Sequence, residues 1–195
     1  IYNKILYTNT PLCHLIQIAP DLKARILLVN GVSKAYAMTG WRIGFAAGDR
    51  SLIQAMEKIQ SQSTSNPSSV SQIAATAALT GPQDILKTHV EAYHKRCTFV
   101  IESLEKIQGL HPVHPEGAFY IFVCCAGVIG KKTPQGMVIK TDQDFVCYLL
   151  EEAQIAVVPG SVFGMSPFFR LSYATDMMSL QTAMQRLSEA CRVLR

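Results

Sequence analysis

Two basic side chains at a fixed spacing carry the clearest chemistry in this sequence. Lys34 comes three residues after Gly31, and Arg42 stands eight residues further on, between Gly40 and Gly44. A lysine amine can form a Schiff base with an aldehyde, and a guanidinium offers a planar fork of donors that matches two phosphate oxygens. The glycines would let the backbone approach a ligand closely. The spacing therefore indicates a site for a phosphorylated aldehyde.

The apolar run before Lys34 predicts how the lysine is positioned. Residues 26–29 read Ile-Leu-Leu-Val, which is typical of a buried strand in a parallel sheet. Ligands of open α/β sheets bind beyond the carboxyl ends of the strands, which is where Lys34 falls. Burial and a nearby cation both disfavour a protonated amine, so Arg42 would help to keep Lys34 reactive. A surface lysine followed by an unrelated structural arginine is the alternative, and the glycines and Trp41 weigh against it.

A second basic side chain, Arg170, lies in the apolar run Phe-Phe-Arg-Leu-Ser-Tyr at residues 168–173. A guanidinium in the middle of an apolar strand needs a partner when it is buried. One interpretation is an ion pair with an internal carboxylate. The other is bidentate binding of a substrate carboxylate. The chemistry alone leaves both interpretations open.

Composition limits the class of protein and its partners. The chain has 195 residues, 49% of them hydrophobic and 16% charged, with a mean hydropathy of +0.18. These values are typical of a globular protein with a substantial core. The formal charge of +4 is small and scattered, so we expect no nucleic-acid partner. We also expect no membrane association, because no apolar stretch is long enough to span a bilayer and the first residues lack a signal-peptide profile.

Cysteine and histidine are dispersed along the chain. Six cysteines occur without a Cys-x-x-Cys spacing, which is typical of reduced thiols in a cytoplasmic protein. His111 and His114 have no cysteine or carboxylate at metal-ligand spacing. We therefore expect a cytoplasmic location and no metal site.

Apolar periodicity and capping residues predict the secondary structure. Helices are expected at about residues 51–62, 68–80, 82–108, 141–153 and 176–191. Short strands are expected at residues 118–123, 155–158 and 168–174, with a loop or hairpin at 127–140. Gly81 would end the second helix and Pro82 would begin the third. This long helix would bridge two lobes, of which the second has an α+β pattern.

The run from Gly31 to Gly44 closely resembles the pyridoxal-phosphate attachment motif of class I aminotransferases. The segment around Arg170 resembles the substrate-carboxylate arginine of the same family. The chain as a whole is similar to the C-terminal portion of a fold-type I aminotransferase, most of all to the bacterial aspartate/prephenate subgroup. The resemblance implies an α/β fold. Residues 1–95 would be the C-terminal part of the cofactor-binding large domain, with a mostly parallel sheet, and residues 96–195 a small α+β domain.

The resemblance also implies the roles of the site residues. Lys34 would hold pyridoxal 5'-phosphate and act as the catalytic residue, Arg42 would bind the cofactor's phosphate, and Tyr2 would contact its phenolic oxygen. Many relatives have a serine at the position of Gly31, whose hydroxyl binds phosphate, whereas Gly31 could offer only its backbone N–H. Residues 117–120 would shape the substrate pocket.

Further implications concern substrate and partner. Arg170 would bind the substrate carboxylate, and Ser65 and Asn66 would contact the neighbouring subunit of a homodimer. The expected reaction is transamination between aspartate and 2-oxoglutarate in an intact enzyme, of which this chain is a part that we expect to be inactive alone. Alternatives are another fold-type I reaction, such as aromatic or alanine transamination or C–S cleavage, and an effector-binding domain of a regulator. The sequence does not distinguish the preferred substrate side chain.

Overall fold

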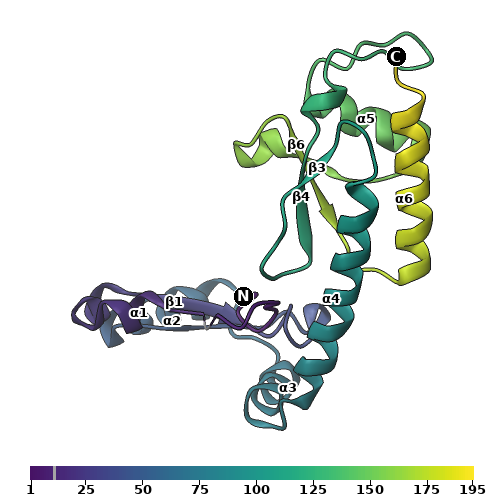
Figure 1. Ribbon diagram of the computed structural model, residues 1–195. Helices are drawn as coiled ribbons and strands as arrows, with labels where there is room; N and C mark the ends of the chain where they lie inside the picture. The colour runs from purple at the N-terminus through teal and green to yellow at the C-terminus, as the bar shows by residue number, and fades with distance from the viewer. Residues whose placement is uncertain (11) are drawn as a thin grey trace. The chain divides into compact units, whose positions relative to one another are not determined.

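A computed structural model describes residues 1–10 and 12–195 of the chain. The chain divides into two compact units, Ile1–Val90 and Glu91–Arg195, which we call unit 1 and unit 2. The division falls inside helix α4 (Asp84–Leu104), and each unit has a sheet of its own (Figure 1).

Unit 1 is built on a two-stranded sheet. Strand β1 (Leu28–Gly31) pairs antiparallel with β2 (Gly44–Ala47), and Gly31 lies opposite Gly44. The helical segments are α1 (Leu15–Ile18), α2 (Arg50–Ser63), α3 (Ser69–Thr80) and the 3-10 turns η1 (Pro20–Arg25) and η2 (Thr39–Trp41). Strand β1 begins two residues later than the apolar run predicts, and Val29 is 68% exposed. An apolar run predicts that a strand is buried. In the described part of unit 1, however, no other segment covers this strand well enough to bury Val29.

Helices α2 and α3 begin and end within one residue of the prediction. The Asp49 carboxylate caps α2 by accepting a hydrogen bond from the Ser51 backbone N–H at 2.9 Å. Gly81 ends α3, although its backbone is not left-handed. A Cβ at Gly81 would lie 2.6 Å from the Ala77 carbonyl oxygen, so close approach rather than backbone freedom requires glycine there.

Unit 2 contains a four-stranded antiparallel sheet in the order β3-β4-β6-β5. The strands are β3 (His111–Pro112), β4 (Tyr120–Cys124), β5 (Val158–Pro159) and β6 (Phe168–Ser172). The helical segments are α5 (Asp142–Ala153), α6 (Met177–Arg192), η3 (Ala126–Val128) and η4 (Gly160–Phe163). The predicted capping box forms: Thr141 Oγ1 accepts from the Asp144 N–H at 3.1 Å, and the Asp144 carboxylate accepts from the Thr141 N–H at 3.0 Å.

Helix α4 is shorter than the predicted range of 82–108. Its last α-helical residue is Leu104, and the chain then tightens, with the Ile107 N–H donating to the Leu104 carbonyl at 3.0 Å. Gly109 has a φ of +91°, which allows the chain to turn. The glycine therefore marks the reversal of the chain, while the apolar periodicity continues past the end of the α-helix.

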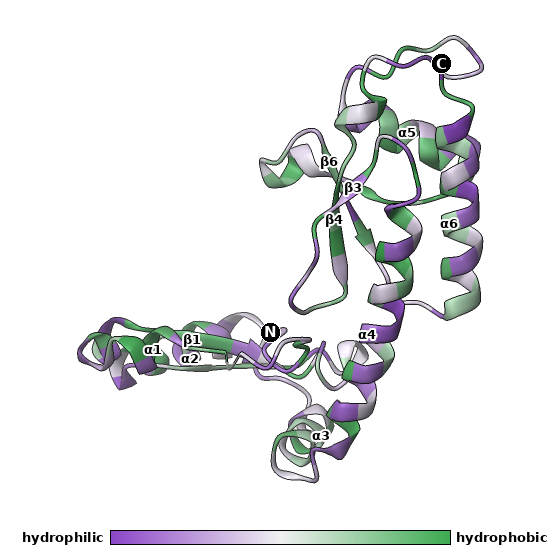
Figure 2. Cartoon of the chain, in the orientation of Figure 1, coloured by the Kyte–Doolittle hydropathy of each residue, from purple (hydrophilic) through white to green (hydrophobic). Residues whose placement is uncertain are grey.

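Most of the buried apolar side chains belong to unit 2. Its core joins α4, the sheet, α5 and α6 through side chains with no exposed surface, namely Val100, Leu104, Ile121, Val123, Phe145, Leu149, Phe169, Tyr173 and Leu187. Figure 2 shows hydrophobic residues at the start of β1 in unit 1 and along β4 in unit 2. Both units therefore have apolar strand residues, with different degrees of burial.

No helix in the described part of the chain is long and apolar enough to cross a bilayer.

Candidate functional site

Lys34 and Arg42 lie in one loop, which joins β1 to β2. Because Gly31 and Gly44 face each other across the two strands, the loop leaves and returns at the same end of the sheet. The antiparallel pairing therefore brings both basic residues to the end of β1, where the sequence predicts a ligand.

The first half of the loop is a compact turn around Lys34. The Met38 N–H donates to the Ser33 carbonyl at 3.1 Å, and the Ala37 N–H donates to the Lys34 carbonyl at 3.3 Å. Val32 and Ala35 are 1% and 3% exposed, so they fix the backbone on either side of the half-buried lysine.

Two contacts tie this turn to the neighbouring helix. The Tyr36 hydroxyl donates to Gln83 Oε1 at 2.8 Å, just before α4 begins. The Nδ1 of His89, within α4, lies 3.3 Å from the Ala35 carbonyl oxygen. The backbone that carries Lys34 is thus held between β1 and the start of α4.

Arg42 occupies an uncommon backbone conformation. Its φ of 51° and ψ of 47° are left-handed, and Ala37 in the same loop has a φ of 54°. Such conformations are costly for residues with a Cβ and are enriched at ligand sites. One guanidinium nitrogen, Nη1, donates to the Thr39 carbonyl at 2.9 Å, and within the described chain the guanidinium makes no other hydrogen bond. Its exposed remaining N–H groups suit an anion such as phosphate.

Gly31 lies where β1 and β2 approach each other closely. Its N–H donates to Asn30 Oδ1 at 2.8 Å, so this group is already engaged by protein. A Cβ at this position would lie 3.2 Å from the Ile43 carbonyl oxygen and 3.4 Å from the Gly44 Cα. Glycine therefore permits the close approach of β1 and β2. Its role in binding phosphate stays a prediction.

The N-terminal segment that contains Tyr2 lies beside the end of β1. The Ile1 Cδ1 atom would be 3.7 Å from a Cβ at Gly31. Asn3 Oδ1 accepts a hydrogen bond from Asn30 Nδ2 at 3.4 Å. The chain therefore brings Tyr2, which is half-buried, to the same end of the sheet as the Lys34 loop.

Ser65 and Asn66 lie in the exposed link between α2 and α3. Ser65 is left-handed, with a φ of 64°.

Arg170 lies in unit 2, on β6. It is half-buried and stands opposite Phe122 of β4 and Val158 of β5. Its guanidinium carbon Cζ is 4.5 Å from the centre of the Tyr120 ring and 4.6 Å from the centre of the Phe163 ring. Arg170 forms no ion pair within the described residues, where the observed pair is His114 with Glu105. Aromatic rings rather than a carboxylate therefore hold the guanidinium.

These two rings were not identified from the sequence. Tyr120 falls in the segment 117–120 that resembles a pocket-shaping stretch, which was a weak signal for it. Phe163 lies in the η4 turn, where no periodicity indicates which way a side chain faces.

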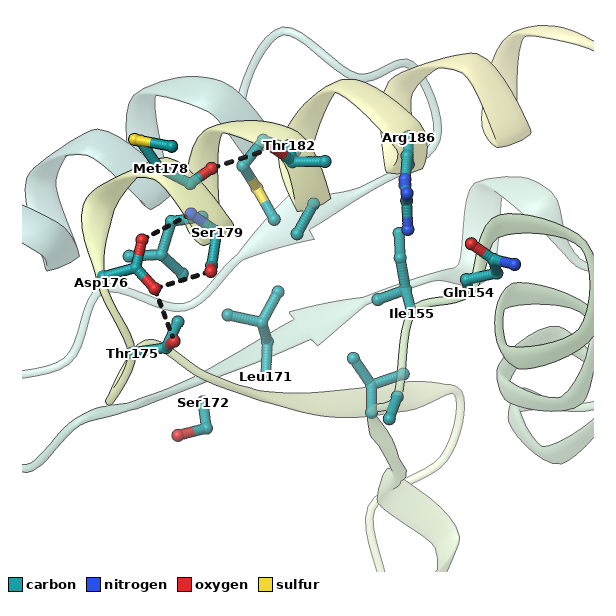
Figure 3. A pocket seen from close by; sticks show the side chains of 15 residues that line it. Gln154, Ile155, Leu171, Ser172, Thr175, Asp176, Met178, Ser179, Thr182 and Arg186 are labelled. Carbon is teal, nitrogen blue, oxygen red and sulfur yellow. Dashed lines mark hydrogen bonds between the residues drawn. The ribbon is translucent and has the colours of Figure 1, made fainter.

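A cavity of about 610 Å³ in unit 2 lies apart from Arg170. It lies beside the start of α6, and its lining includes Leu171 but not Arg170, since successive residues of a strand face opposite sides. Figure 3 shows that the Asp176 carboxylate at its wall caps α6, accepting from the Ser179 N–H at 2.9 Å and from the Ser179 hydroxyl at 2.6 Å. No predicted site residue lines this cavity.

The cysteine thiols have no partners for disulfide or metal chemistry in the described residues. The six cysteines are free, and no group of three histidine, cysteine or acidic side chains could hold a metal ion there. Burial raises the pKa of Cys125 to about 12, with a further contribution from Asp142, and burial raises the pKa of Cys191 to about 12. These two thiols therefore stay protonated at neutral pH.

The fold and the lysine loop are those of an aminotransferase family. The profile of the family described as aminotransferase class I and II matches residues 1–187. The chain therefore belongs to the class I and II aminotransferases.

Curated relatives show which members of this family the chain is similar to. The chain is 56% identical over 191 residues to an aspartate aminotransferase of Rhizobium meliloti (strain 1021), covering 98% of this chain and 47% of the relative. It is 51% identical over 194 residues to a probable aspartate/prephenate aminotransferase of Rickettsia typhi, covering 100% of this chain and 49% of the relative. The chain thus spans about half the length of the curated relatives it matches.

Solved structures confirm the α/β fold class. The crystal structure of an aspartate aminotransferase from Rhizobium meliloti matches with a TM-score of 0.97 and 55% identity, over 100% of this chain and 49% of that one. An aspartate aminotransferase from Thermus thermophilus with maleate matches with a TM-score of 0.85 and 35% identity, over 97% of this chain and 46% of that one.

Proposed function

We propose that this chain is the part of an aspartate aminotransferase that carries the cofactor lysine and the substrate-binding arginine. The complete enzyme transfers an amino group between aspartate and a 2-oxo acid, 2-oxoglutarate, with pyridoxal 5'-phosphate as cofactor. The observation that carries the proposal is the placement of Lys34 and Arg42 on one loop at the end of β1. An amine and an exposed guanidinium on one loop fit an aldehyde that bears a phosphate.

Each residue of the loop has a separate task. Lys34 would hold the cofactor through its ε-nitrogen and would move the proton at the substrate Cα. Arg42 binds the phosphate through the guanidinium N–H groups that the Thr39 carbonyl leaves unused. Tyr2 contacts the phenolic oxygen of the cofactor. The cofactor supplies an electron sink for the pair released when the Cα proton leaves.

Arg170 binds the α-carboxylate of the substrate. Contact with the Tyr120 and Phe163 rings fixes the guanidinium without using up its N–H donors, and no internal acid in the described chain competes for them. A planar fork of N–H groups binds a carboxylate bidentately. The Thermus thermophilus relative whose structure contains maleate, a dicarboxylate, supports a dicarboxylic substrate such as aspartate.

The two compact units support the expected domains. We propose that unit 1 belongs to the cofactor-binding large domain and that unit 2 is the small domain; the expected boundary follows residue 95, and the compact units divide after Val90. Ser65 and Asn66 face the partner subunit of a homodimer, which the exposure of their link supports. The free thiols support a cytoplasmic location.

The test is turnover of the complete enzyme, this chain together with the remaining length that its relatives have. Lys34→Ala should abolish formation of oxaloacetate from aspartate and 2-oxoglutarate, while the cofactor still binds non-covalently, because the variant lacks the amine that would hold the aldehyde and move the proton. Lys58→Ala, which changes an exposed lysine on α2, is the matched control and should retain activity. Substantial turnover by the Lys34 variant would rule out the assignment.

Prephenate is the second candidate amino acceptor. The Rickettsia relatives, whose names include prephenate, favour it. Product analysis with aspartate and either 2-oxoglutarate or prephenate separates the two. Aromatic or alanine transamination and C–S cleavage are tested separately, by supplying phenylalanine, alanine or a thioether amino acid in place of aspartate and identifying the products.

A further inference from the structure

We propose that Asp142 is a positioning residue for Arg170, because it anchors the turn that holds Phe163 against the guanidinium. This inference rests on the proposed role of Arg170 in binding the substrate carboxylate. It assigns Asp142 a function beyond the start of α5, where the sequence indicates only a capping box.

Asp142 is a buried acid with both carboxylate oxygens engaged. The residue is 2% exposed. Its Oδ2 accepts a hydrogen bond from the Ser161 backbone N–H at 2.7 Å, and its Oδ1 accepts one from the Ser166 hydroxyl at 2.8 Å. Burial raises the pKa of Asp142, but the hydrogen bonds from Ser161 and Ser166 outweigh it and hold the pKa below the ordinary value of 3.8. The side chain is therefore ionised at neutral pH, and its charge is favourable in the first turn of α5.

The two donors stand at opposite ends of one short segment, residues 161–166, which we call the anchored turn. Ser161 belongs to η4, and Ser166 precedes Pro167 and the start of β6. One carboxylate thus ties both ends of the anchored turn to α5. Phe163 lies between the two ties.

The anchored turn is also closely packed at its base. The Met165 N–H donates to the Gly160 carbonyl at 3.0 Å, and the Gly164 N–H donates to the Ser161 carbonyl at 3.0 Å. A Cβ at Gly160 would lie 2.0 Å from the Met165 carbonyl oxygen, so only glycine fits there. The turn therefore has little freedom to move Phe163 independently of its ties to Asp142.

Phe163 is held in place by the turn and not by a core. Its side chain is 46% exposed, and it contacts the Phe122 ring edge-on with 5.6 Å between the ring centres. Tyr120, the other ring at Arg170, stands on the paired strand β4. The position of the guanidinium thus depends on one ring from the sheet and one ring from the anchored turn.

Loss of the carboxylate should act on substrate binding more than on the chemical step. Asp142→Asn keeps the shape of the side chain but removes its charge and replaces one acceptor oxygen by an NH2 group, so the charge-assisted hydrogen bonds to Ser161 and Ser166 weaken. The turn loosens, Phe163 leaves the guanidinium, and Arg170 loses its fixed orientation. Because Lys34 carries out proton transfer, the change should raise KM for aspartate while kcat stays nearly constant.

The experiment measures kcat and KM for aspartate in the complete enzyme. The wild type, Asp142→Asn, Phe163→Ala and the double variant form a double-mutant cycle. Asp142→Asn and Phe163→Ala should each raise KM about tenfold, and the double variant should be no worse than Phe163→Ala alone, since both act through one ring. Ser166→Ala removes one of the two hydrogen bonds to Asp142 and should raise KM about twofold to threefold. This variant replaces Asp142→Asn in the test if Asp142→Asn folds poorly. Asp144→Asn is the matched control, because that acid caps the same helix and does not touch the anchored turn.

The Arg170→Ala variant distinguishes a failure of the proposed role of Arg170 from a failure of the proposed role of Asp142. If this variant leaves KM unchanged, the proposed role of Arg170 fails. If it raises KM while Asp142→Asn and Ser166→Ala do not, only the positioning role of Asp142 is overturned. Fully additive effects in the double variant, a fall in kcat at constant KM, or an equal effect of Asp144→Asn would also overturn it.

Discussion

Units 1 and 2 use their apolar residues in opposite ways. Among the described residues, the buried hydrophobic side chains of unit 1 are Ile5, Val32, Ala35 and Ala75, and all the others belong to unit 2. Large hydrophobic side chains that are more than 65% exposed show the reverse, since apart from Met178 at 76% they belong to unit 1, with Ile18 and Val29 at 68% and Ile59, Val70 and Ile73 at 71–72%. Unit 2 therefore contains its own core, whereas unit 1 presents apolar surface that requires a further contact.

The sheet of unit 1 leads to the same conclusion. Strands β1 and β2 pair only with each other in the described chain, so the outer edge of each is open. An isolated pair of strands is marginally stable, and open edges without charges invite further pairing. The unit that carries Lys34 and Arg42 is thus the one that needs additional protein, which agrees with the greater length of the relatives.

The largest expected effect is a difference in hydrogen exchange between the units of the isolated 195-residue chain. Amides of β4 and β6, which are backed by the core, should exchange about a thousandfold more slowly than those of β1 and β2. Residues 84–195 alone, which retain all of α4, should keep the slow exchange of β4 and β6. Equal protection of β1 and β6 would contradict the comparison.

Truncation of one side chain in each unit tests the same contrast at single-residue level. Leu149→Ala removes a side chain with no exposed surface in unit 2 and should lower the free energy of unfolding by about 3 kcal/mol. Ile59→Ala changes a side chain that is 71% exposed in unit 1, and the loss should stay below about 0.5 kcal/mol. Urea unfolding followed by circular dichroism measures both. A larger loss for the Ile59 variant would mean that unit 1 has a core of its own.

The smallest expected effect is the acid dependence of unit 2. The hydrogen bonds from Ser161 and Ser166 overcome the effect of burial and lower the pKa of Asp142, and the backbone hydrogen bond from Lys140 lowers the pKa of Asp144. A carboxyl whose pKa is lower in the folded state contributes stability that is present above the ordinary value of 3.8 and is lost as pH falls through the folded pKa.

Urea unfolding of residues 84–195 should therefore give a constant free energy of unfolding from neutral pH down to about pH 4 and a decline below it. Asp142→Asn should flatten that decline, because the amide does not titrate. The same decline in wild type and variant would show that other acids dominate.

Local features of the fold could be predicted from the sequence. The capping box at Thr141 and Asp144, the cap at Asp176 and the stop at Gly81 each depend on residues within one turn, and each is observed. The lysine loop was predicted for the same reason, since Lys34 and Arg42 are only eight residues apart.

Features that depend on distant residues were missed. The rings around Arg170 come from β4 and η4, and the anchor of that turn comes from α5, so nothing in the local sequence connects them. The end of α4 was misplaced because apolar periodicity persists through the tighter turn after Leu104.

The central claim is that the nitrogen at position 34 holds the cofactor aldehyde. The most direct measurement is borohydride reduction of the cofactor-loaded complete enzyme, followed by digestion and mass spectrometry of the labelled peptide. We predict a reduced pyridoxyl phosphate group on Lys34 alone, and no label in the Lys34→Ala variant. A label on another lysine, or none in the wild-type enzyme, would contradict it.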